Sequence, residues 1–243
     1  MKIAAHGWEL ELAPEHGGAI VALRHAGRDI LCPVRHGSHD PLDSACFPLV
    51  PYANRIADGR FRFAGQSYAL PRNFGDHPHS LHGLGWQAAW QVEAQAEDGA
   101  TLSHAHNGGS GWPWPYRAMQ LFALAPGCAS VTITLTNLSE QAVPGGIGLH
   151  PYFPRGSLSR LTARAQQLWL ADATMLPTRA TDPAQFGDFA AGASLDGETL
   201  IDNAYAGWDG IAEIEQGDGV LRMEAEGAAA FHLFRPPGED FFC

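Results

Sequence analysis

The chain has 243 residues, of which 45% are hydrophobic and 17% are charged. This composition is typical of a folded globular protein, and β-sandwiches of about 200–250 residues are commonly one domain. The formal net charge is −11 with only 15 Lys and Arg, which argues against nucleic acid and anionic membranes as partners. We therefore expect residues 1–243 to form a single domain.

The N-terminal stretch "MKIAAHGWELEL" lacks the apolar core of a signal peptide, and no run of 18 apolar residues occurs. The four cysteines, at positions 32, 46, 128 and 243, are widely spaced and form no C-x-x-C pair. Such scattered thiols are typical of reduced cysteines in a cytoplasmic protein. The pattern gives no indication of oligomeric state.

Hydrophobic residues recur mostly with a period of two, which predicts β-strands. In "GRFRFAGQSYALP", Phe61 and Phe63 alternate with arginines and Tyr68 resumes the alternation, which predicts a hairpin that turns at 64–66. The segments 116–127, 129–137, 219–227 and 228–234 also read as strands, and we expect the last two to pair around Gly227. The window 182–191 is the only passable helix. The sequence therefore predicts an all-β, antiparallel sandwich with its function on loops and on a concave face.

Arg55 lies in the polar part of "FPLVPYANRIADGRF" (47–61), just before the predicted hairpin. Its planar guanidinium offers several donors to hydroxyl or carboxylate oxygens. For a lone arginine, however, a structural bond to loop carbonyls is the commoner role.

Three histidines, His77, His79 and His82, stand within six positions in "NFGDHPHSLHGLGW" (73–86). Neutral imidazoles bind zinc, but no Cys or H-E-x-x-H partner accompanies them, so we expect no metal. His82, followed by the flexible "GLG", suits a polyhydroxylated ligand better. For His77 and His79 a solvated or structurally bonded ring is favoured.

His150 and Asp202 are the remaining candidates. His150 closes a predicted strand in "GGIGLHPYFP" (145–154), where it serves either as a general acid or base or as a core histidine. Asp202 precedes Tyr205 and Trp208 in "LIDNAYAGWDG" (200–210). Aromatic platforms beside a carboxylate are the expected complement of a sugar, with its apolar faces and hydroxyl rim.

In order along the chain, "NRIADGRF", "SLHGLGWQAAW", "GLHPYFP", "IDNAYAGW" and "PPGEDFFC" resemble the aldose 1-epimerase (mutarotase) family, small bacterial type. The resemblance covers nearly the whole chain. It implies a galactose mutarotase-like supersandwich, a small-molecule hexose substrate and no metal or organic cofactor. It also implies that His150 is the catalytic acid, that His82 assists it, and that Arg55 and Asp202 bind the sugar.

The family's base is a glutamate that follows the "FFC" segment in a pattern of the type F-C-x-E-P. Glu239 and Asp240 both precede the aromatic pair, so neither matches it. We therefore expect the domain to be C-terminally incomplete at Cys243. Two alternatives to a mutarotase follow: a non-catalytic hexose-binding protein, and an epimerase of hexose 6-phosphates, for which the expected basic cluster is absent.

Overall fold

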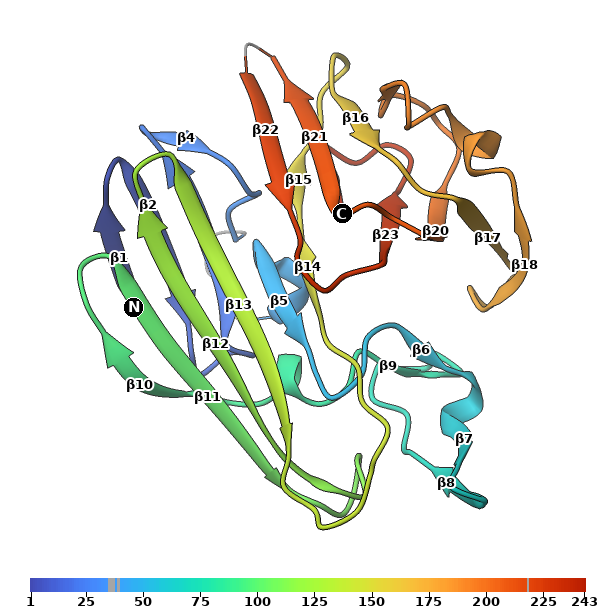
Figure 1. Cartoon of the computed structure of the whole chain (residues 1–243). Helices are drawn as coiled ribbons and strands as arrows, with labels where there is room; N and C mark the ends of the chain where they lie inside the picture. Colours follow the sequence, from blue (N-terminus) through green and yellow to red (C-terminus); the bar gives the residue numbers. More distant parts are fainter. Residues whose placement is uncertain (35–37, 39, 218) are drawn as a thin grey trace. The chain divides into compact units, whose positions relative to one another are not determined.

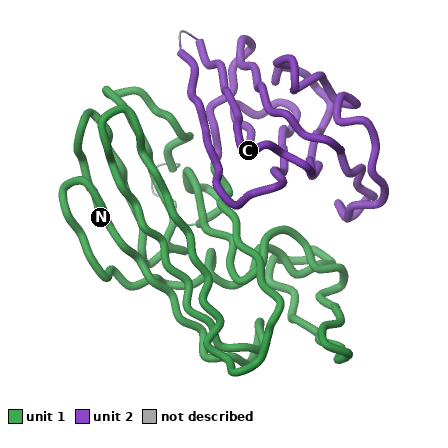
Figure 2. Tube along the Cα trace, in the orientation of Figure 1, with its two compact units in different colours: residues 1–151 green, residues 152–243 purple. Residues whose placement is uncertain are grey.

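The computed structural model describes residues 1–34, 38, 40–217 and 219–243. The chain divides into two compact units, Met1–Pro151 and Tyr152–Cys243 (Figure 2). All ladders between the described strands are antiparallel, so the prediction of an antiparallel all-β protein is confirmed. The single-domain organisation stays a prediction.

Helical structure in the described residues is limited to short 3-10 turns: η1 (Pro41–Asp43), η2 (Ala57–Gly59), η3 (Gly85–Gln87) and η4 (Pro183–Phe186). None of these is long and apolar enough to cross a membrane. The predicted helical window at 182–191 is reduced to η4, because Asp182 caps a single turn and Gly187 follows it at a φ of 140°.

The described residues of unit 1 form two larger sheets and two small ladders (Figure 1). The first sheet has the order β1-β2-β3-β5-β14 with β4 beside β3: β1 (Lys2–Ala5), β2 (Trp8–Ala13), β3 (Ala19–His25), β4 (Arg28–Asp29), β5 (Cys46–Leu49) and β14 (Gly148–Pro151). The second is β10 (Gln91–Gln95), β11 (Gly99–Asn107), β12 (Pro115–Ala125) and β13 (Cys128–Asn137). The small ladders join β6 (Arg55–Ile56) to β9 (Ser80–Leu81) and β7 (Arg60–Phe63) to β8 (Gln66–Ala69).

Alternation of buried and exposed residues explains the long strands. Along β12 every second residue, from Tyr116 through Phe122 to Leu124, is buried. On β13, Val131 and Ile133 are half-buried while their neighbours are exposed. The strands predicted from residues 116–127 and 129–137 are therefore confirmed.

The predicted hairpin of β7 and β8 is confirmed, with Phe63 opposite Gln66. Ala64 and Gly65 both have positive φ, as a tight two-residue turn requires. The hairpin packs on the tryptophans of "GWPWPY": Tyr68 lies 4.6 Å from Trp114, measured between ring centroids. This packing fixes the segment that begins with Arg55.

In unit 2, residues 152–217 and 219–243 form two four-stranded sheets and one small ladder. One sheet is β19 (Ala193–Ser194), β16 (Arg160–Ala163), β21 (Ile211–Gln216) and β22 (Gly219–Glu224). The other is β18 (Pro177–Thr181), β17 (Gln167–Ala171), β20 (Ile201–Ala206) and β23 (Ala230–Arg235), and the ladder joins β15 (Phe153–Pro154) to β24 (Phe241–Phe242). Its most deeply buried large side chains, among the described residues, are Tyr205, Phe242, Leu168, Leu195, Ile201, Ile214 and Leu233.

The predicted pairing of 219–227 with 228–234 is wrong. β22 pairs with β21, whereas β23 pairs with β20 in the other sheet (Figure 1). Phe231 stacks on the buried ring of Tyr205 with centroids 4.8 Å apart, and this contact draws β23 away from β22. Gly227 therefore lies in a connection between sheets.

Candidate functional site

Two of the predicted site residues, His82 and His150, lie together in unit 1. β14 runs antiparallel to β5, and His150 pairs with Phe47 across the ladder. The Phe47 ring stacks on His150 with centroids 4.6 Å apart. His82 meets the same imidazole edge-on, at 5.5 Å and an interplanar angle of 81°. His82 and His150 thus form a histidine pair, and the Phe47 ring packs against it.

Asn54 connects this histidine pair to Arg55. Its backbone N–H donates to Nδ1 of His82 at 3.1 Å, and its carbonyl accepts from the His82 N–H at 3.0 Å. Its side-chain oxygen accepts from the backbone and from Nη1 of Arg55, at 2.9 and 3.1 Å. Because Nδ1 of His82 is an acceptor here, a neutral His82 carries its proton on Nε2 and is a donor there.

Asn54 was not identified as a site residue from the sequence, although it stands in the motif "NRIADGRF". Its role depends on a φ of 64°, a left-handed conformation that asparagine tolerates better than most residues. An asparagine directly before a candidate arginine is the signal that could have indicated it.

The segment that carries His82 is held by a second asparagine, Asn73. Its side-chain nitrogen donates to the carbonyls of Leu81 and Gly83, at 2.6 and 2.9 Å, and its oxygen accepts from the Leu81 N–H at 2.7 Å. These bonds bracket His82, whose own φ is 59°. The backbone of His82 is therefore fixed from both sides.

The "GLG" segment after His82 is closely packed, so the expectation that it is flexible is wrong. Gly83 has a φ of 75°, and a Cβ added there would lie 2.1 Å from the backbone oxygen of Val50. A Cβ on Gly85 would lie 2.2 Å from a methyl group of the same valine. Both glycines are required for close approach of the two backbones.

His77 and His79 are bonded to backbone groups. Nδ1 of His79, a buried residue, accepts from the Asp58 N–H at 3.0 Å, and Nδ1 of His77 accepts from the His79 N–H at 3.2 Å. Nδ1 of each of the three imidazoles in this segment thus accepts a hydrogen bond from a different backbone amide. Among the described residues, no group of three or more His, Cys, Asp or Glu side chains is arranged to hold a metal ion.

Asp202 belongs to β20 in unit 2, where it pairs with His232 of β23. Nε2 of His232 lies 2.5 Å from a carboxylate oxygen of Asp202. Since an ionised carboxylate only accepts, the imidazole donates this bond. No separate feature of the sequence indicated His232. That Asp202 shares a site with Arg55, His82 and His150 stays a prediction.

The aromatic platform predicted beside Asp202 is wrong in its residues. Tyr205 is 1% exposed and Trp208 is 8% exposed, so both belong to the core of unit 2. Alternation along β20 explains this, because Asp202 and Tyr205 lie three positions apart and face opposite sides of the sheet. Burial of the Tyr205 hydroxyl raises its pKa well above the usual value.

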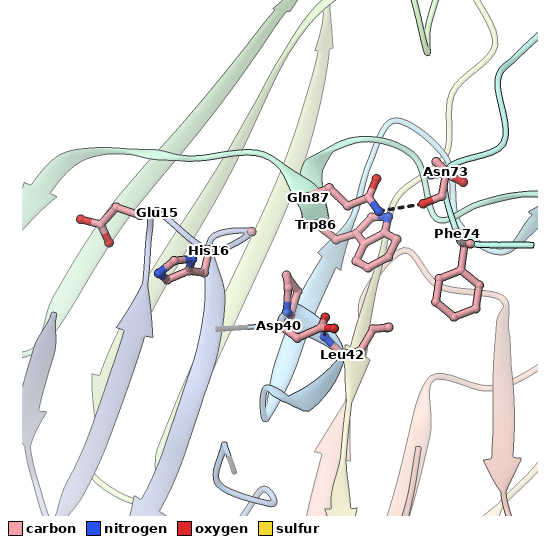
Figure 3. A pocket seen from close by; sticks show the side chains of 11 residues that line it. Glu15, His16, Asp40, Leu42, Asn73, Phe74, Trp86 and Gln87 are labelled. Atoms are coloured by element: carbon pink, nitrogen blue, oxygen red, sulfur yellow. Dashed lines mark hydrogen bonds between the residues drawn. The ribbon is translucent and has the colours of Figure 1, made fainter. Parts of the chain in front are cut away.

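A separate pocket of about 350 Å³ adjoins the Asn73 segment (Figure 3). Asn73, Phe74, Trp86 and Gln87 line one side of it, and the Gln87 side chain donates to the backbone oxygen of Asn73 at 2.7 Å. Asp40 is among its other lining residues. The histidine pair and Arg55 are not among the described residues that line this pocket.

The sequence as a whole matches the family described as aldose 1-epimerase, over residues 10–243. The chain belongs to the aldose 1-epimerase family. The protein YphB of Escherichia coli K12 is 35% identical to it over 212 residues, which cover 83% of this chain and 72% of that protein.

Solved structures of family members have the same fold. A crystal structure of an aldose 1-epimerase candidate from Escherichia coli K12 has a TM-score of 0.92 at 32% identity, covering 100% of this chain and 85% of that one. A galactose mutarotase-like protein from Clostridium acetobutylicum has a TM-score of 0.85 at 19% identity, covering 100% and 82%. The predicted galactose mutarotase-like β-sandwich is therefore confirmed.

Proposed function

We propose that this member of the aldose 1-epimerase family interconverts the α and β anomers of a free hexose by acid–base opening of the sugar ring. Ring opening requires a base to take the proton of the C1 hydroxyl and an acid to protonate the ring oxygen. Rotation about the C1–C2 bond followed by the reverse proton transfers closes the ring on the other face. No redox step or group transfer is involved.

His150 is the proposed acid and His82 its partner. The observation that carries this assignment is the edge-on contact of the two imidazoles at 5.5 Å above the Phe47 ring. Because the Asn54 N–H donates to Nδ1 of His82, Nε2 is the nitrogen that carries the proton in the neutral ring and acts as a donor. A fixed donor stabilises negative charge that builds on an oxygen, and it needs no reorganisation during the reaction.

Arg55 and Asp202 are the proposed sugar-binding residues. The Asn54 oxygen accepts from Nη1 of Arg55 and so orients the guanidinium, whose planar geometry suits hydroxyl oxygens. Asp202 contributes acceptors for hydroxyl protons. The resemblance implies that a glutamate after the "FFC" segment is the base.

Polarimetry of freshly dissolved α-D-glucose and α-D-galactose tests the proposal. We expect His150→Ala to lower kcat by about 10²–10⁴-fold, the usual contribution of one general acid, with hexose affinity changed little. His82→Ala removes a charge-stabilising donor and should cost about 10²-fold or more. His6→Asn, a change at an exposed histidine in the β1–β2 turn, is the matched control and should leave the rate unchanged.

The assay is run on this chain and on a chain extended after Cys243 by x-E-P, which completes the F-C-x-E-P pattern that Phe242 and Cys243 begin. Mutarotation that is unaffected by His150→Ala contradicts the proposed acid. Hexose binding without turnover in either chain favours a non-catalytic hexose-binding protein. Turnover of hexose 6-phosphates alone favours a hexose-6-phosphate epimerase.

A further inference from the structure

One face of the unit 2 sheet formed by β18, β17, β20 and β23 presents a row of three cross-strand neighbours. Trp169 of β17 pairs with Ala204 of β20, and Ala204 pairs with His232 of β23. Directly paired residues project from the same face of a sheet. All three are only partly buried, whereas Leu168 and Tyr205, on the opposite face, form the core.

Asp202 lies on this same face, diagonal to His232 and one pair along from Ala204. Its side chain is 10% exposed and that of His232 is 30% exposed, so the 2.5 Å bond between them is largely shielded from solvent. A shielded hydrogen bond to a charged group is strong and holds the carboxylate in one orientation. The two carboxylate oxygens together have about four acceptor positions, so this group can accept from several donors at once.

Ala204 has a short side chain and lies between the longer side chains of Trp169 and His232. Trp169 and His232 stand two strand spacings apart, about 10 Å from backbone to backbone. The methyl group of Ala204 is much shorter than the flanking indole and imidazole, and the residue is only partly buried. The indole offers an apolar face on one side, and the Asp202–His232 pair offers polar groups on the other.

We propose that Trp169, Ala204 and His232 form, together with Asp202, a hexose-recognition face on unit 2. The C–H face of the sugar packs against the indole of Trp169, and its hydroxyls bond to the Asp202 carboxylate. His232 is a positioning residue that acts through Asp202. The identity of the ligand rests on the proposed function, whereas the face itself rests on strand register and the Asp202–His232 bond.

Hexose binding by the full chain tests this face without requiring turnover. The seven tryptophans give separate indole N–H signals in ¹⁵N-labelled protein, and Trp169→Phe identifies the signal of Trp169. We expect saturating D-galactose or D-glucose to shift this signal in the parent chain. An unshifted Trp169 signal, or no hexose binding at all, overturns the proposal.

Matched substitutions on β20 provide the second arm. Ala204→Leu lengthens this short side chain and should weaken hexose binding about tenfold or more, a change of about 1.4 kcal/mol per factor of ten. Ala206→Leu, on the same strand and face but opposite Gln167 and Ala230, should change affinity less than about twofold. Equal effects of the two variants overturn the proposal, and melting curves confirm that each is folded.

The positioning role of His232 is tested by a conservative rescue. His232→Ala should raise KM several-fold with little change in kcat, and His232→Gln, which keeps an N–H donor for Asp202, should restore most of the affinity. A His232→Gln variant as weak as His232→Ala contradicts positioning through this bond. If turnover depends on His150 but the variants at Ala204 and His232 bind hexose as tightly as the parent chain, the recognition face is rejected and the proposed activity stands. If the variants at Ala204 and His232 lose hexose affinity as expected but no turnover is detected, the proposed activity is rejected and the recognition face stands.

Discussion

Cys46 lies in β5 beside the histidine pair and is 3% exposed. Burial raises the pKa of its thiol to about 12, although a hydrogen bond with the His150 backbone opposes the shift. The thiolate is the reactive form of cysteine. We expect an aromatic disulfide reagent at neutral pH to label the exposed Cys128 promptly and to reach Cys46 only after unfolding. Peptide mapping of the labelled sites checks this, with Cys128→Ser as the control. Fast labelling of Cys46 in the folded chain would contradict its burial.

His104 in β11 provides a prediction about pH. Its ring lies beside Trp90 and 3.2 Å from the Tyr116 hydroxyl, and burial lowers the pKa of the imidazole below its ordinary value of 6.5. As pH falls below 6.5, the unfolded chain binds a proton at this residue before the folded chain does, so the free energy of unfolding decreases.

Substitution of His104 by Gln should therefore flatten the dependence of stability on pH between about 6.5 and 5, the range in which an unperturbed histidine titrates. Urea titrations at several pH values measure the slope. The exposed His6 supplies the control, because His6→Asn should leave the slope as it is. An unchanged slope for His104→Gln would mean that other groups dominate acid destabilisation.

At the scale of an element, the side chain of Asn73 determines the conformation of the segment around His82. Asn73→Ala removes three hydrogen bonds to Leu81 and Gly83. We expect a loss of about 3 kcal/mol in the free energy of unfolding, at about 1 kcal/mol per bond. Displacement of His82 should also lower kcat in the polarimetric assay.

Gln87→Ala is the matched control for Asn73→Ala. Among the described residues, the exposed Gln87 side chain makes one hydrogen bond, to the backbone oxygen of Asn73, so its loss should cost less than about 1 kcal/mol. Chemical denaturation gives both values. Comparable stabilities of the two variants would show that the Asn73 side chain does not hold the segment.

The alternation of hydrophobic and polar residues determined which elements could be predicted from the sequence. Period-two patterns identified the strands of residues 116–137, because each strand has one buried face. Alternation does not determine the partner of a strand, so the pairing of β22 and β23 was predicted wrongly. The position of Gly227 suggested a hairpin, but packing of Phe231 on Tyr205 decided the partner.

Candidate site residues could be proposed from the sequence where a motif carries the side chain, and not where a distant strand supplies it. The proximity of His82 and His150 could not be derived from residue spacing, but the family resemblance implied a shared role. The functions of Asn54 and Asn73 depend on backbone conformation and on bonds across a fold. Trp169 reaches Ala204 only through strand register, and no local pattern around either residue indicates it.

At the scale of the whole molecule, the net charge of −11 separates neutral from anionic substrates. Between about 0.01 and 1 M salt the screening length falls from about 30 to 3 Å. Affinity for a free hexose should be unchanged over this range, because the sugar carries no charge.

Affinity for a hexose 6-phosphate should be lower at low salt and should rise as salt screens the repulsion between the acidic protein and the phosphate. Calorimetric titrations with both ligands at matched salt concentrations measure the difference. Tighter binding of the phosphate at low salt would indicate a local basic site and would favour the 6-phosphate epimerase.

The alternation along β20 also bears on how this family can acquire new specificities. Asp202, Ala204 and Ala206 face one way, while Ile201, Asn203 and Tyr205 face the other. If the proposed face binds the sugar, mutations at Asp202 and Ala204 can therefore alter which sugar is accepted while the core stays intact. A deletion of one residue within the strand exchanges the two sets between the core and the opposite face and should prevent folding. A deletion of two residues keeps each remaining side chain on its face. In related genes we expect length changes near β20 to occur in its flanking loops, and diversity within it to concentrate on alternate codons.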